Sequence, residues 1–425
     1  MREDFLHYLW KHGKFENTKL NTTQGEVIQI FSVGEHNLNA GPDFFNVKLS
    51  IAGQLWAGNL EIHIKSSDWY VHHHEKDIRY NNVVLHVVWQ DDMVVFRKDE
   101  SIIPTLELKR YVSEKLISNY ETLLKREKKF INCEKNIRNI NRFILNNWKE
   151  RLYIERLEQK SKPIFKELEA SKNDWEATLF RMLAKNFGLT VNGDAFYEMA
   201  KMIPFDIIRK IQHDALSLEA LLFGVSGLLK NDNDVENVYQ KELLERFNFL
   251  KRKFSDIKAS QFTPKFFRLR PNNFPTIRLS QLAMVYTNYR NVFSKLILSK
   301  NIEETFVVLN VRASDYWETH YTFGKTSAYR KKNVSKEFIS LLIINTIIPL
   351  QFCYARYKGD AIDEELIARI TALPAEKNQI IEKFKALKLE LDSAIDSQAL
   401  LQLYRYYCTQ NQCLHCAIGN AILKS

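Results

Sequence analysis

Two acidic residues near the front of the chain have the spacing of a metal site. Asp43 follows Gly41-Pro42, and Glu61 comes eighteen residues after it. Two carboxylates on neighbouring strands can hold a divalent metal through their oxygen atoms. A basic side chain two residues after the second acid can stabilise an attacked phosphate or orient the attacking water. His63 stands at that position, so the pattern predicts a Mg²⁺ or Mn²⁺ site with hydrolytic chemistry.

Two further residues compete for roles beside this acidic pair. Lys65 lies one strand period after His63 and is the alternative basic partner. Glu35, which lies in a predicted turn before Asp43, would add a third carboxylate to the metal site. The simpler interpretation is that Asp43 caps a turn and Glu61 is a solvated strand residue.

Histidines concentrate just after the acidic pair. An imidazole can activate water or protonate a leaving oxygen near neutral pH, and His72 or His74 would take that role. Alternatively, His72, His74 and His86 would hold zinc or another transition metal. Each histidine taken alone fits a solvated loop or a core position, but their density beside the two acids favours a site. Within 24 positions the chain carries His63, His72, His73, His74 and His86.

The elements that must position these residues follow from the apolar pattern. Alternation along 55–64 puts Glu61, His63 and Lys65 on one face of a strand and the apolar residues on the other. The order of elements predicts a compact α/β unit over residues 1–110. The predicted elements are a helix over 2–12, strands over 26–31, 44–51 and 55–64, a loop with a short helix over 68–82, and strands over 83–89, 93–96 and 105–108.

The rest of the chain has the apolar spacing of helices. Pro163 should kink or end the first of them. We therefore predict an α+β protein with three domains, over 1–110, 111–260 and 261–425, the break between the helical parts lying within 255–275. The predicted helices cover 143–168, 175–187, 216–229, 235–254, 279–298, 336–357, 363–373, 375–391 and 397–407.

Composition limits the class of protein. Of the 425 residues, 45% are hydrophobic and 26% are charged, as in a soluble globular protein. No apolar run reaches the roughly 18 residues of a membrane span, and the longest apolar stretch, 338–352, predicts a buried helix. No secretory signal pattern opens the sequence. The 5 cysteines, an odd number, fit a reducing compartment, so we expect a cytoplasmic protein without a membrane partner.

The charge suits a polyanionic partner such as nucleic acid. The net charge is +10 and the isoelectric point is near 9.1, although a solvated lysine surface would explain both values equally well. Basic and aromatic residues alternate over 262–278, the best candidate for a surface that faces an anion. Other basic clusters lie at 125–129, 251–253 and 330–332. For any single cluster, charged helix faces over a core are the simpler explanation.

The acidic pair and the element order resemble those of the PD-(D/E)XK, or restriction-endonuclease-like, superfamily. The resemblance covers about residues 1–100 and rests on Pro42-Asp43, on Glu61-Ile62-His63 and on the order αβββαβ, with the acids on the second and third strands. It implies a metal-dependent nuclease or nuclease-like phosphodiesterase. The chain departs from the motif in having His63 where the superfamily has lysine.

Three cysteines and a histidine lie within nine residues near the end of the sequence. Thiolates at this spacing suit Zn²⁺ or an iron–sulfur cluster. Some nucleases of the superfamily hold a cluster with one distant cysteine, and by that resemblance Cys353 is preferred to Cys133 as the fourth ligand. Small buried thiols between packed helices are the simpler alternative. The C-terminal residues are Cys408, Cys413, His415 and Cys416.

A longer pattern resembles the signature of an uncharacterised bacterial family, a domain of unknown function. This resemblance covers nearly the whole chain and implies no activity. The pattern runs through Gly41-Pro42-Asp43-Phe44, Asp68-Trp69, Asp77-x-x-Tyr80-Asn81, Leu85-His86-Val87-Val88 and Asn273-Phe274-Pro275 to the C-terminal cysteines.

Three functions remain open on these observations. The first is a metal-dependent nuclease or phosphodiesterase in which Asp43 and Glu61 bind the metal. The second is a non-catalytic scaffold on the same fold that binds nucleic acid or protein. The third is a transition-metal enzyme that uses the histidine-rich segment on a different fold.

Overall fold

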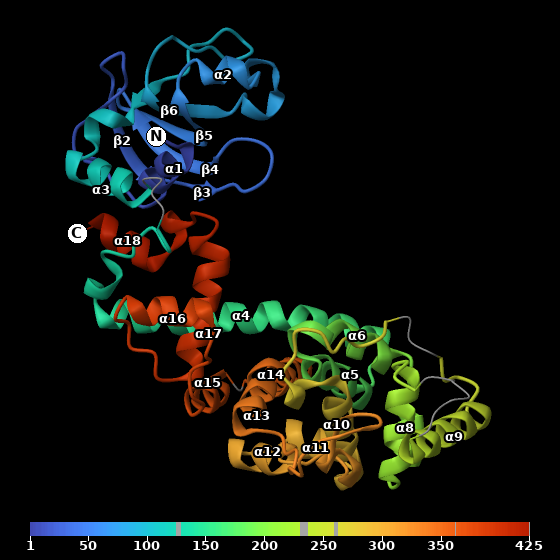
Figure 1. Ribbon diagram of the computed structural model, residues 1–425. Coiled ribbons are helices and arrows are strands. Elements are labelled where there is room, and N and C mark those ends of the chain that lie inside the picture. The colour runs from blue at the N-terminus through green and yellow to red at the C-terminus, as the bar shows by residue number, and fades with distance from the viewer. Residues whose placement is uncertain (125–128, 230–236, 259–261, 362, 425) are drawn as a thin grey trace. The chain divides into compact units, whose positions relative to one another are not determined.

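The chain folds as two compact units. The computed structural model describes residues 1–124, 129–229, 237–258, 262–361 and 363–424. Unit 1 comprises Met1–Trp148 with Leu403–Ser425, and unit 2 comprises Lys149–Gln402, so unit 2 is an insertion in the sequence of unit 1 (Figure 1). This division differs from the three domains expected from the sequence, because no unit boundary falls near 110 or 260. The predicted basic cluster at 125–129 lies almost entirely outside the described residues.

A mixed β-sheet forms the N-terminal part of unit 1. The strand order is β1-β2-β4-β5-β6-β7, and the short strand β3 also pairs with β4. The pairings are antiparallel as far as β5, and then β5, β6 and β7 run parallel. The strands are β1 (Leu20–Asn21), β2 (Val27–Ser32), β3 (Glu35–His36), β4 (Phe44–Ile51), β5 (Gln54–Lys65), β6 (Val83–Gln90) and β7 (Thr105–Glu107).

Local sequence explains the central strands. Ala52 and Gly53 join β4 to β5 with φ of 50° and 83°, the left-handed backbone of a tight hairpin turn. β6 is apolar on both faces and is buried from Val83 to Val88, as expected for an inner parallel strand. The predicted strand over 93–96 is wrong, because Phe96 makes only an isolated bridge to Ile102.

Helices from both ends of the sequence complete unit 1. α1 (Glu3–Lys11) packs against β5, and its buried side includes Phe5, Leu9 and Trp10. α2 (Asp68–Val71) also packs against β5 and is followed by two 3-10 turns, η1 (His74–Lys76) and η2 (Ile78–Tyr80). α3 (Glu114–Leu124) packs against α18 (Ala417–Lys424), which explains why the C-terminal segment belongs to this unit.

Unit 2 is helical. α4 begins in unit 1, and it continues through Pro163 rather than ending there. The predicted helix over 279–298 is two helices, α10 and α11. The helices are α4 (Arg142–Ala170), α5 (Trp175–Phe187), α6 (Leu189–Lys201), α7 (Phe205–Ile211), α8 (Ala215–Val225), α9 (Val238–Lys253), α10 (Pro275–Asn288), α11 (Val292–Ile297), α12 (Ile302–Leu309), α13 (Lys336–Leu342), α14 (Ile348–Lys358), α15 (Asp363–Thr371), α16 (Gln379–Ala386) and α17 (Ala394–Leu403).

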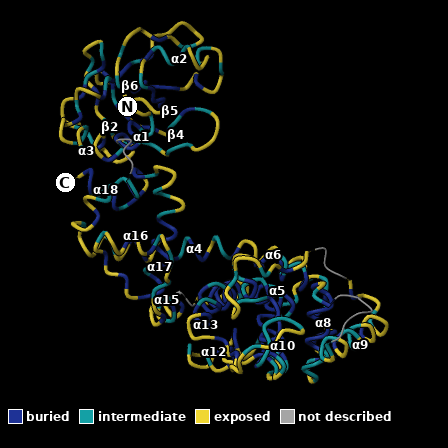
Figure 2. Tube along the Cα trace, viewed as in Figure 1, coloured by how far each residue is buried: buried dark blue, intermediate teal, exposed yellow. Residues whose placement is uncertain are grey.

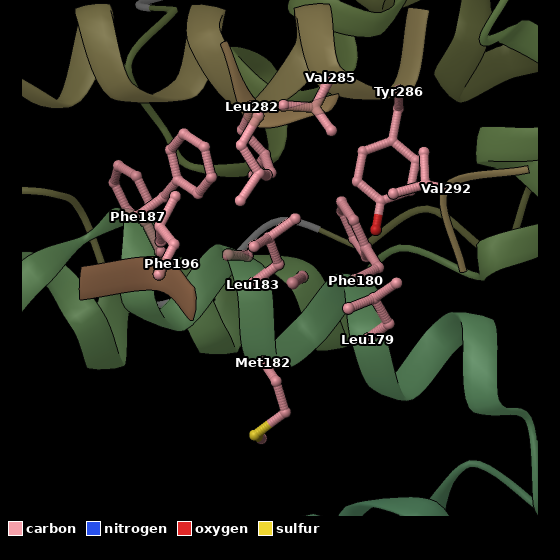
Figure 3. Close-up of a cluster of buried hydrophobic side chains, with 14 of the residues drawn as sticks. Leu179, Phe180, Met182, Leu183, Phe187, Phe196, Leu282, Val285, Tyr286 and Val292 are labelled. Carbon is pink, nitrogen blue, oxygen red and sulfur yellow. The ribbon is translucent and has the colours of Figure 1, made fainter. Parts of the chain in front are cut away.

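One hydrophobic core runs through unit 2. Leu183 and Phe187 of α5 and Leu282 and Tyr286 of α10 belong to the same buried cluster (Figure 3). Figure 2 shows the buried stretches of α5, α8 and α10 in dark blue. The two predicted helical domains therefore share a core.

One continuous helical stretch resembles a membrane span. Lys336–Lys358 is long and apolar enough to cross a membrane, but 83% of its apolar window is buried inside the protein. It is therefore a core helix, as predicted for 338–352. With a mixed sheet at the front and helices over most of the rest, the protein is α+β, as the sequence predicted.

Candidate functional site

The structure brings the two predicted acids together. Asp43 directly precedes β4, and Glu61 lies on β5, the neighbouring strand. Glu61 Oε2 accepts a hydrogen bond from the backbone N–H of Asp43 at 3.1 Å. Asp43 Oδ2 in turn accepts one from the backbone N–H of Ile62 at 2.9 Å. This reciprocal pair of bonds fixes both carboxylates at one point of the sheet.

Three histidines meet beside Glu61. His63 Nε2 lies 3.1 Å from His72 Nδ1, and His74 Nε2 lies 3.2 Å from Glu61 Oε1. Each of the three offers a ring nitrogen within 4.8 Å of the others, so the set could hold one metal ion. We call His63, His72 and His74 the histidine group. Behind it, the His63 Nδ1 lies 2.8 Å from Nε2 of His86, which is fully buried on β6.

A second set of ligands comes from α1. Glu3, His7 and Asp43 offer donor atoms within 4.8 Å of one another, and we call them the carboxylate group. His7 Nε2 lies 3.1 Å from Asp43 Oδ2 and 3.8 Å from Glu3 Oε1. Sequence reasoning missed Glu3 and His7 because it used this helix only for its apolar face. The available signal was their spacing of four residues, which puts both on one helix face.

Glu61 lies between the two groups. Its Oε1 approaches the histidine group, at 3.2 Å from His74 and 3.5 Å from His63, while its Oε2 is bonded to the backbone of Asp43. Two neighbouring ligand sets that share one carboxylate could hold a pair of metal ions, as in a two-metal site.

Burial controls the protonation of these groups. Burial, and then the charge of Asp43, raise the pKa of Glu61 to about 9. Burial, and then the nearby histidines, lower the pKa of His63 and bring that of His74 to about 4 and that of His86 to about 3. The buried imidazoles are therefore neutral at pH 7, which is the form that binds metals. For His7, burial opposes protonation, but the Asp43 carboxylate raises its pKa overall.

Aromatic side chains hold the histidine rings in place. The His74 ring stacks on Tyr80, with ring centroids 3.8 Å apart. The fully buried Trp69 contacts both His74 and His86, and its indole N–H donates to the carbonyl of Phe96 at 3.2 Å. Such outer contacts fix ring orientation in metal sites.

The comparison with known families covers both ligand groups. A family model described as "Protein of unknown function (DUF2851)" matches residues 3–379. The chain belongs to this family. The match begins at Glu3 and ends before the C-terminal cysteines. No curated protein and no solved structure matches the chain.

In this DUF2851 chain, the predicted site residues Lys65 and Glu35 are exposed and belong to neither ligand group. In the described part of the chain, no hydrogen bond or ion pair joins the Lys65 ammonium to Asp43 or Glu61. Glu35 lies on β3, opposite Phe45, rather than in a turn. Successive residues of a strand point to opposite faces of the sheet, so Glu35 and His36 point to opposite faces. The His36 ring lies 5.3 Å from the ring of His7, so it is His36 and not Glu35 that faces α1.

The cysteines of the DUF2851 chain divide differently from the sequence prediction. Cys353 is fully buried in the core of unit 2. Cys408, Cys413 and Cys416 lie in unit 1, where Cys133 joins them at one small cavity. The choice of Cys353 over Cys133 as the partner of the C-terminal thiols is therefore corrected.

Proposed function

We propose that the protein is a metal-dependent phosphodiesterase that acts on nucleic acid. The observation that carries this proposal is the position of Glu61 between the carboxylate group and the histidine group. In two-metal phosphodiesterases and nucleases, ions about 3.5–4 Å apart stabilise both the attacking and the leaving oxygen. The strand arrangement supports the proposal, since Asp43 directly precedes β4 and Glu61 lies on β5, its antiparallel neighbour in the order β1-β2-β4-β5.

The ligand chemistry favours Mn²⁺ or Zn²⁺ over Mg²⁺. Mg²⁺ takes oxygen ligands and keeps several waters, whereas imidazole suits first-row transition metals. Here His63, His72 and His74 would hold one ion and Glu3, His7 and Asp43 the other, with Glu61 shared. When bound, the ions would polarise the phosphate and supply a hydroxide nucleophile near neutral pH. The role of the protein is to hold these imidazoles and carboxylates in place.

The nucleic-acid substrate rests on charge. A net charge of +10 raises the local concentration of a polyanion and speeds its association. A cytoplasmic location is consistent with this substrate and with five free cysteines.

The decisive experiment is cleavage of end-labelled single-stranded, duplex and branched DNA and RNA by the full chain with Mn²⁺. Asp43→Asn and Glu61→Gln should each reduce the rate at least about 100-fold. Glu35→Gln is the matched control, because it removes an exposed carboxylate from a neighbouring strand, and it should retain activity. Full activity in both site variants would refute the proposal.

Other outcomes point to the alternatives. Binding of nucleic acid without cleavage under every metal would indicate a scaffold with an inactive site. Metal bound by the histidine group without phosphodiester hydrolysis would indicate a different transition-metal reaction.

A further inference from the structure

Four of the five cysteines line one small cavity in unit 1. The cavity has a volume of about 20 Å³, and its other walls are mainly apolar, including Leu123, Leu403 and Ile418. One of the thiols comes from the segment between α3 and α4, and three come from the C-terminal segment. The four are Cys133, Cys408, Cys413 and Cys416.

The cavity places N–H groups against the sulfur atoms. Cys416 directly precedes α18, and although burial raises the pKa of its thiol, the backbone N–H groups of Gly419 and Ile418 at the start of this helix oppose that rise. Asn132 Nδ2 donates to Cys413 Sγ at 3.3 Å. Donors of this kind stabilise a thiolate more than a thiol, as they do around metal-bound cysteine.

The backbone is shaped to bring the loop onto α18. A Cβ at Gly419 would lie 2.1 Å from the carbonyl oxygen of Cys413, so no other residue fits without a shift. This close approach holds Cys413 and Cys416 at the start of the helix.

Cys353 shows what an ordinary buried thiol looks like in this protein. It is fully buried in an apolar core, and burial alone raises its pKa. At Cys133 and Cys408, burial and then the neighbouring cysteines raise the thiol pKa, because these groups lie close enough to interact. Simple packing accounts for Cys353 but not for four thiols around a shared cavity.

We propose that Cys133, Cys408, Cys413 and Cys416 bind a metal centre as four thiolates. Four cysteine ligands are the set for a structural zinc ion or an iron–sulfur cluster. Each thiol would release its proton on binding.

The four sulfur atoms lie farther apart in this structure than the ligands of a single tetrahedral zinc ion. Zinc binds sulfur at about 2.3 Å, so the ligands of one tetrahedral ion lie about 3.8 Å apart. Among the described residues, no three of these sulfur atoms lie within 4.8 Å of one another. A cluster distributes its cysteines over several irons and accepts the wider spacing.

Metal analysis of the full chain, purified without oxygen, tests the centre. We expect stoichiometric iron and acid-labile sulfide, with visible absorption that bleaches on reduction. Cys133→Ala should lose the metal, whereas the matched control Cys353→Ala, also a buried cysteine, should keep it. Zinc in place of iron and sulfide would still support the four-thiolate site, with a single ion.

A measurement on the wild-type chain guards against variants that fail to fold. Alkylation followed by mass spectrometry should show the four thiols protected until the metal is removed by acid or chelator. A chain that holds no metal as isolated, and takes up none when reconstituted with iron and sulfide or with zinc, would overturn the proposal.

A second and independent feature is a basic cavity in unit 2 of about 440 Å³. Arg278 is buried in its wall and donates to Gln281 Oε1 at 2.8 Å and to Asn273 Oδ1 at 2.6 Å. Its Nε is buried and has no hydrogen-bond partner among the described residues. A buried guanidinium whose hydrogen bonds go to neutral amides lacks the counter-charge that normally accompanies such a group.

The lining residues supply more positive charge. They include no Asp or Glu among those that the structure describes. Buried Lys332 donates to the backbone carbonyls of Trp317 and Glu318, so its ammonium is held in the wall. The cations of the cavity are Arg270, Arg278, Arg330, Lys331 and Lys332.

We infer that this cavity binds the phosphate group of an anionic ligand. Its volume lies in the range of small-ligand sites, about 300–1,000 Å³. It joins the end of the 262–278 stretch to the 330–332 cluster, both of which stood out in the sequence.

Binding of pyrophosphate and of a short single-stranded oligonucleotide to the full chain tests this site. Arg330→Gln, at an exposed position, and Arg278→Gln should each weaken binding at least about tenfold. Arg252→Gln removes the same charge from an exposed position on α9 and should have little effect. Binding of pyrophosphate alone would identify a small phosphate ligand. Binding of both pyrophosphate and the oligonucleotide would identify a nucleic-acid backbone as the ligand. Unchanged binding in both cavity variants would overturn the inference, whatever the outcome of the cleavage assay.

Discussion

Glu61 joins the two ligand groups and is only 4% exposed. A buried ionised carboxylate is costly unless a cation or several hydrogen bonds compensate it. For Glu61 the neighbouring carboxylate of Asp43 adds to the cost rather than reducing it. Without a metal, the side chain is therefore better accommodated in its protonated form.

This protonation predicts how the stability of the metal-free protein depends on pH. Folded Glu61 keeps its proton to about pH 9, whereas in the unfolded chain it ionises near 4.5. Between these two pH values the folded state binds one more proton than the unfolded state. The free energy of unfolding therefore falls as pH rises from about 7 to about 9. In Glu61→Gln this fall should be smaller, by on the order of 2 kcal/mol. Melting curves with a chelator across this range measure it, and identical slopes in the two proteins would contradict it.

We expect His86 to affect metal binding although it belongs to neither ligand group. Its Nε2 lies 2.8 Å from His63 Nδ1, so it orients the ring that faces the site. His86→Leu leaves His63 without that partner and should weaken Mn²⁺ binding by about 10- to 100-fold. Calorimetric titration measures the affinity. The control is His73→Asn, since His73 is exposed and adopts a φ of 59° that Asn tolerates; a loss there equal to that in His86→Leu would contradict the assignment.

At the scale of elements, the site depends on how closely β5 approaches the start of β6. A Cβ at Gly58 would lie 2.5 Å from the side chain of Val84 and 2.6 Å from the carbonyl oxygen of Asn82. The same carbonyl accepts a hydrogen bond from the backbone N–H of Asn59 at 2.8 Å. Glu61 follows Asn59 by two residues on β5, so this close contact helps to fix the part of the strand that carries the site.

Substitution at Gly58 should therefore disturb the site through the strand. Gly58→Ala is expected to cost about 1–3 kcal/mol of unfolding free energy, because one close atom belongs to the backbone and the other to a buried valine. Mn²⁺ binding should weaken as well. Ala57→Val is the matched control, since Ala57 is exposed on the same strand and valine suits a strand. Equal stability of the two variants in chemical denaturation would contradict the expectation.

The sequence predicts an element best where it carries a regular pattern. The strand over 44–51 has the predicted bounds because its residues alternate and a tight turn follows. β1 and β3 have two residues each, too few to show a period. The acidic pair could be predicted because adjacent strands bring it together.

Other parts of the sites depend on tertiary contacts that no local pattern carries. Glu3 and His7 reach Asp43 only because α1 packs against the sheet. Cys133 meets Cys413 across 280 positions of sequence, and nothing near Cys133 marks it as a ligand. Likewise, Arg278 and Lys332 are joined in one cavity only by the folding of unit 2.

For the whole molecule, the two units predict two unfolding events. The large hydrophobic core lies in unit 2, and Leu183 within it is completely buried. Leu183→Ala should destabilise unit 2 by about 2–5 kcal/mol and lower only one of two calorimetric transitions. Cys133→Ala should lower the other. A single transition that shifts in both variants would show that the units unfold together.

The insertion of unit 2 within unit 1 also fixes an order of synthesis. The ribosome makes both ligand groups within the first 74 residues and Cys133 soon after, but Cys408, Cys413 and Cys416 only after all of unit 2. A chain that stops early would carry the candidate catalytic residues while lacking three of the four thiols. Assembly at the cysteines would then occur only on chains translated through residue 416, long after both ligand groups have been made.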